Sequence, residues 1–119
     1  MDHSINESSE SRRREETRIA LINHHGRIPV IMKPIGSTLP ALTPCRYLLP
    51  VDMTIANLRN IIKKKLNIKS HEAFFVMVKG MMPLPSLSII QIYDDYKSPD
   101  GYLYLTYALQ EFFGGTGMI

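Results

Sequence analysis

The chain has 119 residues, of which 45% are hydrophobic, and it carries a formal net charge of +3. This length suits one domain with a single core. The lone cysteine, Cys45, excludes an internal disulfide and is typical of a reducing compartment. No apolar run approaches the roughly 18 residues that cross a bilayer, and the polar first residues lack the apolar segment of a secretory signal. We therefore expect a cytoplasmic protein.

The first part of the chain predicts a helix preceded by a polar arm. Residues 1–10 are rich in Ser, Asn and Glu, and we expect them to be disordered. A helix is predicted over 11–23, with charged residues such as Glu16 facing solvent and the apolar residues between 19 and 22 partly inward. Gly26 then stands where a glycine commonly ends a helix.

Two strands joined by a proline-rich loop are predicted next. Residues 27–33 read as a strand, in which Pro29 requires a position where the ladder does not need its N–H. The loop that follows contains prolines and a glycine, and 46–50 reads as a second, short strand.

The central part of the chain predicts a helix followed by a buried strand. Apolar residues recur at helical spacing over 54–66, and Asp52 or Thr54 is suited to cap the helix. The continuous apolar run 73–78 is too short for a buried helix. It therefore predicts a central strand covered on both faces.

The last part of the chain completes the predicted fold. A shorter helix is predicted over 86–97, and an alternating strand over 102–109. A strand pair, a crossing helix and further strands make an α+β, ubiquitin-like β-grasp fold with a four-stranded mixed sheet and an N-terminal helical extension. The right-handed crossover rule predicts that the first and last strands lie parallel at the centre and that 46–50 lies at an edge.

The sequence offers little for catalysis, metal binding or nucleic-acid binding. Cys45 has no adjacent base, and His24, His25 and His71 have no carboxylate or cysteine partner at a convincing spacing. There is no zinc-ligand spacing, phosphate-binding glycine loop or basic helix of a groove binder. We expect no enzyme, no cofactor, no metal and no nucleic-acid partner.

Several short motifs occur in a fixed order along most of the chain. They are RIPVI from Arg27, RYLLPVDMTIANLRNIIKKKL from Arg46, AFF from Ala73, DGYLYLTYA from Asp100, and the closing Phe113-Gly114. In this order and spacing they resemble the autophagy-related protein 8 family of ubiquitin-like modifiers.

The resemblance implies a conjugated modifier. A processing cysteine protease would cut after Gly114, with Gly115 as the alternative, and remove the tail 115–119 from a domain spanning 11–114. Activating and conjugating enzymes would then join the new carboxyl end to phosphatidylethanolamine. The protein would be cytoplasmic before lipidation and on the autophagosome membrane after it. The small glycine is suited to a narrow enzyme channel.

The resemblance also implies that cargo receptors with short acidic motifs add a strand beside 46–50 and fill two hydrophobic pockets. The first pocket would be lined by Pro29, Ile31, Arg46, Leu48 and Tyr102, with either Ile19 or Ala20. The second would be lined by Tyr47, Leu49, Pro50, Leu58, Ile61 and Lys65. A place in the core is an equally good interpretation for four of these residues, Ile31, Leu49, Leu58 and Ile61.

Two other functions fit the same fold. One is a modifier of the autophagy-related protein 12 type, which is joined to a protein rather than a lipid. The other is a β-grasp binding module that is never conjugated. The basic clusters Arg12–Arg14 and Lys63–Lys65 favour acidic partners or anionic membrane in each case.

Overall fold

The computed structural model describes residues 2–36 and 39–110, with the backbone alone for 2–8. The elements in chain order are α1 (Asp2–Asn23), β1 (Arg27–Pro34), β2 (Arg46–Pro50), α2 (Ile55–Lys65), β3 (Phe74–Met77), α3 (Ile89–Tyr96) and β4 (Leu103–Leu109). The predicted order of helices and strands is confirmed.

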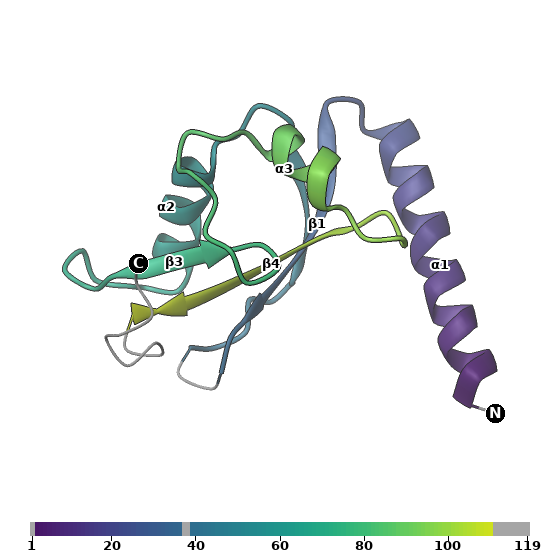
Figure 1. The fold of residues 1–119 in the computed structure, drawn as a ribbon, viewed down its shortest axis with the longest axis horizontal. Coiled ribbons are helices and arrows are strands. Elements are labelled where there is room, and N and C mark those ends of the chain that lie inside the picture. The colour runs from purple at the N-terminus through teal and green to yellow at the C-terminus, as the bar shows by residue number, and fades with distance from the viewer. Residues whose placement is uncertain (1, 37–38, 111–119) are drawn as a thin grey trace.

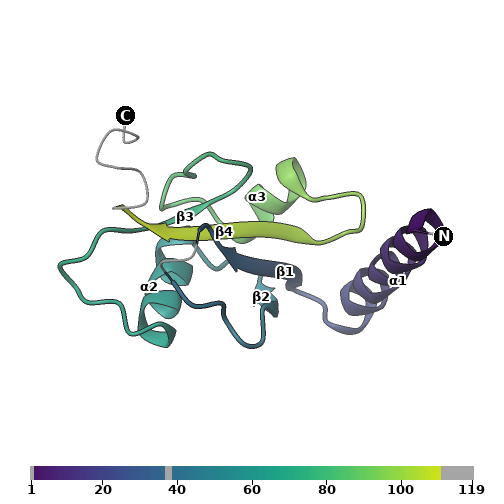
Figure 2. The same ribbon diagram turned by 90° about the horizontal axis from the view of Figure 1, so that it is seen from below.

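The strands form one mixed sheet in the order β2-β1-β4-β3. β1 is antiparallel to β2 and parallel to β4, as the crossover rule predicts. One face of the sheet carries Val30, Leu103 and Tyr107, which are fully buried against apolar residues of α2 and α3. The predicted β-grasp fold, with β1 and β4 at the centre and β2 at an edge, is therefore confirmed (Figures 1 and 2).

The prediction of a central strand over 73–78 is wrong. β3 lies at the edge opposite β2 and pairs with β4 in an antiparallel register, Phe74 facing Leu109. Its apolar run reflects burial of side chains on both faces, with α2 packed on one of them, rather than strands on both sides. Phe74 and Val76 belong to the core cluster with α2, and Met77 is buried on the opposite face.

α1 differs from its prediction in length and in orientation. Helical backbone begins at Asp2, where the sequence predicted a disordered arm over 1–10. The segment contains no glycine or proline to interrupt the helix. In both ribbon views α1 lies at one end of the molecule, and its N-terminal part projects beyond the sheet (Figures 1 and 2).

The inward face of α1 is polar, contrary to the prediction. Ile19 and Ile22 are exposed, whereas Thr17 is buried and Glu16 and Ala20 are half-buried. The reason is the neighbour: this face packs against the turn before β4, at Asp100 and Gly101, and against β1. Helical geometry places residues three or four apart on one side, so the apolar residues fall on the outer side.

The cap of α2 is Thr54 rather than Asp52. The Thr54 hydroxyl accepts a hydrogen bond from the Asn57 N–H at 3.2 Å, which satisfies one free donor of the first turn. α3 begins after Ser88, whose N–H donates to Gln91 Oε1 at 2.9 Å.

Candidate functional site

Two hollows flank the edge strand β2, one on each of its faces. Successive side chains of a strand point to opposite faces. Arg46 and Leu48 therefore face the α1 side of the sheet, and Tyr47 and Leu49 face the side of α2. The hollow on the α1 side has a volume of about 390 Å³ and is lined by Ala20, Pro29, Arg46, Tyr47, Leu48 and Tyr102. We call it the first pocket.

The register of β1 and β2 explains how the first pocket forms. Pro29 pairs with Leu48, and Ile31 pairs with Arg46, so these side chains share one face of the sheet. Ile31 is buried beneath this face and does not line the pocket. Of the two candidates on α1, Ala20 lines the pocket, and Ile19 is 43% exposed elsewhere.

A charged network closes the α1 side of the first pocket. Glu16 Oε1 accepts hydrogen bonds from Arg46 Nη1 at 2.9 Å and from the Tyr102 hydroxyl at 3.0 Å. The Arg46 guanidinium also lies 5.6 Å from the centre of the Tyr102 ring, within cation–π range. Burial, followed by the hydrogen bond to Glu16, raises the pKa of Tyr102 above its ordinary value of 10.0. The pocket thus combines apolar walls with a cation at its rim.

The second hollow, of about 400 Å³, lies on the other face of β2, between the loop 40–43 and the end of α2. It is lined by Pro40, Ala41, Leu42, Thr43, Tyr47, Lys65, Leu66 and Asn67. We call it the second pocket. The Lys65 ammonium lies 5.9 Å from the centre of the Tyr47 ring.

The second pocket shares only part of its lining with the sequence prediction. Tyr47 and Lys65 line it. Leu49 and Leu58 are in the core, where Leu58 is 2% exposed. Pro50 is half-buried and Ile61 is 39% exposed, and neither lines this hollow. The structure therefore brings together two of the six predicted residues here.

The outer edge of β2 is open among the described strands, since β2 is terminal in the sheet. The Met32 N–H donates to the Cys45 carbonyl at 2.9 Å, which marks a hydrogen-bonded pair. Such pairs alternate along an antiparallel ladder, so Arg46 and Leu48 direct their backbone groups away from β1. Arg27 Nη1 donates to the Leu48 carbonyl at 3.0 Å and partly covers this edge.

A buried polar cluster holds α1 against the sheet. The Thr17 hydroxyl donates to the Asp100 carbonyl at 2.7 Å, and Arg13 Nε donates to Asp100 Oδ2 at 2.9 Å. Asp100 Oδ2 also accepts from the Tyr104 hydroxyl at 2.5 Å, and its Oδ1 accepts from the Tyr102 N–H at 2.9 Å. We call this group the α1 latch. It positions Glu16 and Ala20 at the first pocket, since both lie on the same helix.

The α1 latch lowers the pKa of Asp100 and raises the pKa of Tyr104. Burial alone would raise the pKa of Asp100, but hydrogen bonds from Tyr104, from the Tyr102 N–H and from Arg13 hold it below its ordinary 3.8. Burial, followed by the hydrogen bond to the Asp100 carboxylate, raises the pKa of Tyr104 to about 12. The carboxylate is therefore charged and the phenol protonated at neutral pH.

Sequence reasoning missed several residues of this site. Glu16 was expected to face solvent, and the loop 40–43 was not assigned to a pocket. The spacing of Arg13, Thr17 and Ala20 carries a helical signal, but it marks a polar face and does not stand out as an apolar stripe does. The predicted attachment residue Gly114 lies outside the described residues.

Comparison with known proteins identifies the class. Residues 11–114 match the family model described as "Autophagy protein Atg8 ubiquitin like". Autophagy-related protein 8b of Arabidopsis thaliana is 35% identical over 108 residues, covering 90% of this chain and 88% of that protein. Autophagy-related protein 8 of Kluyveromyces marxianus is 34% identical over 109 residues, covering 91% and 87%.

A solved structure agrees with the sequence matches. The crystal structure of Trypanosoma brucei ATG8 superposes with a TM-score of 0.80 at 25% identity, covering 85% of this chain and 88% of that one. The fold and the matches define a ubiquitin-like protein of autophagy. This chain belongs to the autophagy-related protein 8 family.

Proposed function

We propose that this chain is a modifier, not an enzyme, that is attached to membrane lipid and recruits acidic partner peptides along β2. The observation that carries the recruitment part is the arrangement of β2: an open backbone edge with an apolar hollow on each face. An extended peptide added to this edge would place alternate side chains toward opposite faces. Arg46 and Lys65 supply a cation beside each hollow.

The partner peptide is proposed to be acidic, with an aromatic residue and, three positions later, a branched aliphatic residue. The aromatic residue would enter the first pocket and the aliphatic residue the second. The predicted second-pocket residues Leu49 and Leu58 would then contribute from the core, and Pro50 and Ile61 lie outside this hollow. Each buried anchor is worth roughly 1.5–3 kcal/mol, much of which offsets ordering, so we expect a dissociation constant on the order of micromolar.

Titration calorimetry with such a peptide tests the site, with chemical shifts mapped in parallel. Leu48→Ala should weaken binding by about tenfold or more, since it removes an apolar contact worth at least about 1.4 kcal/mol. Arg46→Glu should also weaken binding, in a salt-dependent way, because it replaces the cation beside the first pocket with a charge that repels an acidic peptide. Lys69→Glu is the matched charge reversal at an exposed position outside both pockets, and it should bind as the wild type does. Unchanged affinity in both test variants, with the fold intact, would remove this site from the proposal.

The conjugation part rests on family membership and on the closing sequence, Phe113-Gly114. A cysteine protease would remove 115–119, activating and conjugating enzymes would transfer Gly114 to phosphatidylethanolamine, and the product would reside on the autophagosome membrane. Within the described residues no helix is long and apolar enough to cross a membrane. Two acyl chains would provide a stable anchor at about 0.8 kcal/mol per buried methylene.

Intact mass of the protein from cells tests conjugation. The expected mass loses 115–119 and gains the lipid, and Gly114→Ala should abolish both changes because a Cβ crowds the enzyme channels. A mature form that ends at Gly115 would contradict the assigned cleavage position. A gain of a protein partner would favour the autophagy-related protein 12 type of conjugation, and no gain would favour an unconjugated binding module.

A further inference from the structure

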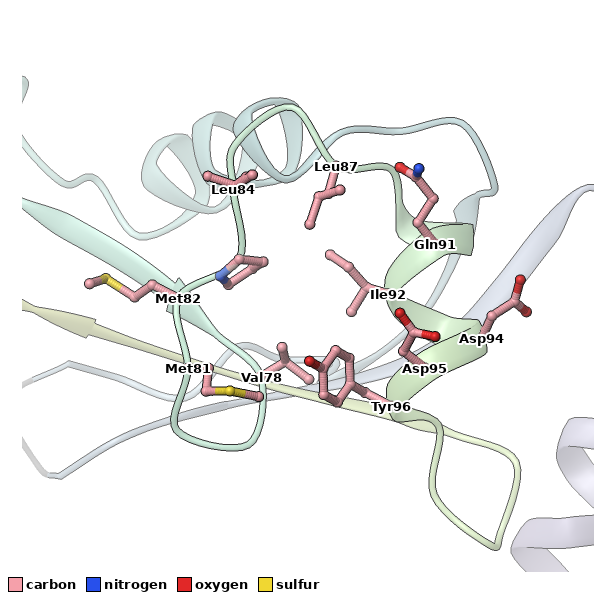
Figure 3. Close-up of a pocket in the computed structure, with 11 residues that line it drawn as sticks. Val78, Met81, Met82, Leu84, Leu87, Gln91, Ile92, Asp94, Asp95 and Tyr96 are labelled. Carbon is pink, nitrogen blue, oxygen red and sulfur yellow. The ribbon is translucent and has the colours of Figure 1, made fainter.

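A further hollow lies away from β2, between the turn that follows β3 and the helix α3. It has a volume of about 560 Å³ and shares no residue with the first or second pocket. Its lining residues are Val78, Met81, Met82, Pro83, Leu84, Leu87, Gln91, Ile92, Asp94, Asp95 and Tyr96. We call it the α3 groove. Figure 3 shows Val78, Leu87 and Ile92 converging on the hollow from different segments.

Three large apolar side chains of the α3 groove are exposed to solvent. Met81 is 48% exposed, Met82 41% and Leu84 66%. Adjacent large apolar side chains left in water mark interaction sites more often than scattered single ones do. Methionine is flexible and polarizable, so its side chains adapt to the shape of an incoming apolar residue.

The groove is held open by rigid segments. The Val78 N–H donates to the Met81 carbonyl at 2.8 Å, and the Met81 N–H donates to the Val78 carbonyl at 2.9 Å, which fixes the turn after β3. On the other side, Ile92 anchors α3 in the core with 2% exposure. The walls are therefore formed before any ligand arrives, which lowers the entropic cost of binding.

The charge of the α3 groove is opposite to that of the chain as a whole. Asp94 and Asp95 are exposed at its α3 side, and no lining residue is basic. In the described part of the chain neither carboxylate forms an ion pair. Figure 3 shows Asp95 beside Ile92 and Tyr96, so a cation there would adjoin an apolar contact. The first pocket, by contrast, presents Arg46.

We propose that the α3 groove binds a basic amphipathic segment of a partner protein. Apolar side chains of that segment would enter between Met81, Leu87 and Ile92, and its Lys or Arg side chains would pair with Asp94 and Asp95. Because the two surfaces share no residue and prefer opposite charges, one molecule would hold an acidic peptide at β2 and a basic one at the α3 groove. Simultaneous binding of linked segments would raise avidity without new contacts.

The test uses the full chain, labelled with ¹⁵N, and a short helical peptide with leucines on one face and lysines on the other. Two matched peptides replace every lysine with glutamate or every leucine with serine. We expect shift changes confined to residues 78–96 with the first peptide, and at least about tenfold weaker binding of each matched peptide. The double variant Asp94→Lys, Asp95→Lys and the single variant Leu84→Ser should each weaken the first peptide by about tenfold. Arg46→Glu should leave its affinity unchanged.

Several outcomes would overturn the proposal. If the glutamate peptide bound as tightly as the lysine peptide, Asp94 and Asp95 would have no part in selecting the ligand. If the serine peptide bound as tightly as the leucine peptide, the contact would depend on charge alone and not on the apolar side chains of the groove. Shift changes outside 78–96 would place the site elsewhere. Groove resonances that move when the protein alone is concentrated would show that a second copy of this chain occupies the groove.

Discussion

Asp100→Asn is the sharpest test of how α1 is held, because it removes one charge and leaves the size of the side chain nearly unchanged. Asp100 is 4% exposed and accepts hydrogen bonds from Arg13, Tyr104 and the Tyr102 N–H. The amide keeps one oxygen, but it turns an NH₂ group toward donors that previously met the carboxylate. At least one of them then lacks an acceptor.

The expected loss of stability follows from those contacts. A hydrogen bond to a charged group contributes about 1.5–3 kcal/mol, and a buried donor left unsatisfied costs about 1–3 kcal/mol. The Arg13 side chain is 32% exposed, so water replaces part of its interaction. We expect Asp100→Asn to lower the free energy of unfolding, or of α1 release, by about 2–3 kcal/mol, near the values of the lost buried contacts.

Two assays separate global unfolding from release of α1. Denaturant unfolding reports the global free energy, and hydrogen exchange of the α1 amides reports local opening. Release of α1 removes Ala20 and Glu16 from the first pocket, so affinity for the acidic peptide should fall as well. Asp94→Asn, an exposed isosteric change, should stay within about 0.5 kcal/mol of the wild type. A loss below about 0.5 kcal/mol with unchanged α1 protection would refute the role of the latch.

The α1 latch also determines how the stability of α1 packing changes as the pH falls. The folded-state pKa of Asp100 is lower than its ordinary 3.8, so the stabilisation is complete above that value and is lost as the pH falls through the folded pKa. Exchange of the α1 amides measured through this acidic range should rise before the core amides lose protection. In Asp100→Asn this acid dependence of α1 should be absent.

Three further changes test the packing. Gly101→Ala should release α1, because Gly101 has a φ of +90° and a Cβ there would lie 2.8 Å from the Thr17 Cβ. Hydrogen exchange of this variant that leaves the α1 amides protected would contradict the close contact. Leu58→Ala should destabilise the fold by about 2–5 kcal/mol in denaturant unfolding, whereas Leu84→Ala at an exposed site should cost far less. Alkaline titration followed by tyrosine absorbance should show a phenol, Tyr104, that ionises near pH 12. Tyr104 stabilises the fold fully below pH 10, and this contribution is lost as the pH rises through about 12. Ionisation of all phenols near 10 would contradict its hydrogen bond to the carboxylate.

The sequence predicted best those features that depend on local periodicity. The helix over 54–66 repeats its apolar residues at helical spacing, so the pattern identifies it without knowledge of the fold. The strand over 27–33 carries a short continuous apolar run from Ile28 to Met32, and all five of these residues are buried. The central position predicted for β3 was wrong for a different reason. A continuous apolar strand reports burial on both faces, but burial from layers and burial between neighbouring strands produce the same residues.

The site was harder to predict because its walls come from segments far apart in the chain. Arg13 and Asp100 are 87 positions apart, and no local pattern in α1 shows that its polar face has a buried partner. The loop 40–43 of the second pocket is likewise held by a residue far away in the sequence. The Leu42 N–H donates to the Tyr107 hydroxyl at 3.1 Å, which in turn donates to the Pro40 carbonyl at 2.9 Å. One buried phenol on β4 thus positions a loop that has no periodic signal.

The Arg46–Glu16 pair determines what an acidic ligand gains at the first pocket. Arg46 is already held by Glu16 at 2.9 Å, so a peptide carboxylate that reaches Arg46 replaces an existing ion pair. Both partners are substantially exposed, and such pairs are worth only about 0–1 kcal/mol, so the exchange is inexpensive but yields little net affinity. Binding strength under the proposed function must then come from the apolar anchors on the two faces of β2. Charge mainly selects the partner by penalising basic peptides near Arg46 and Lys65.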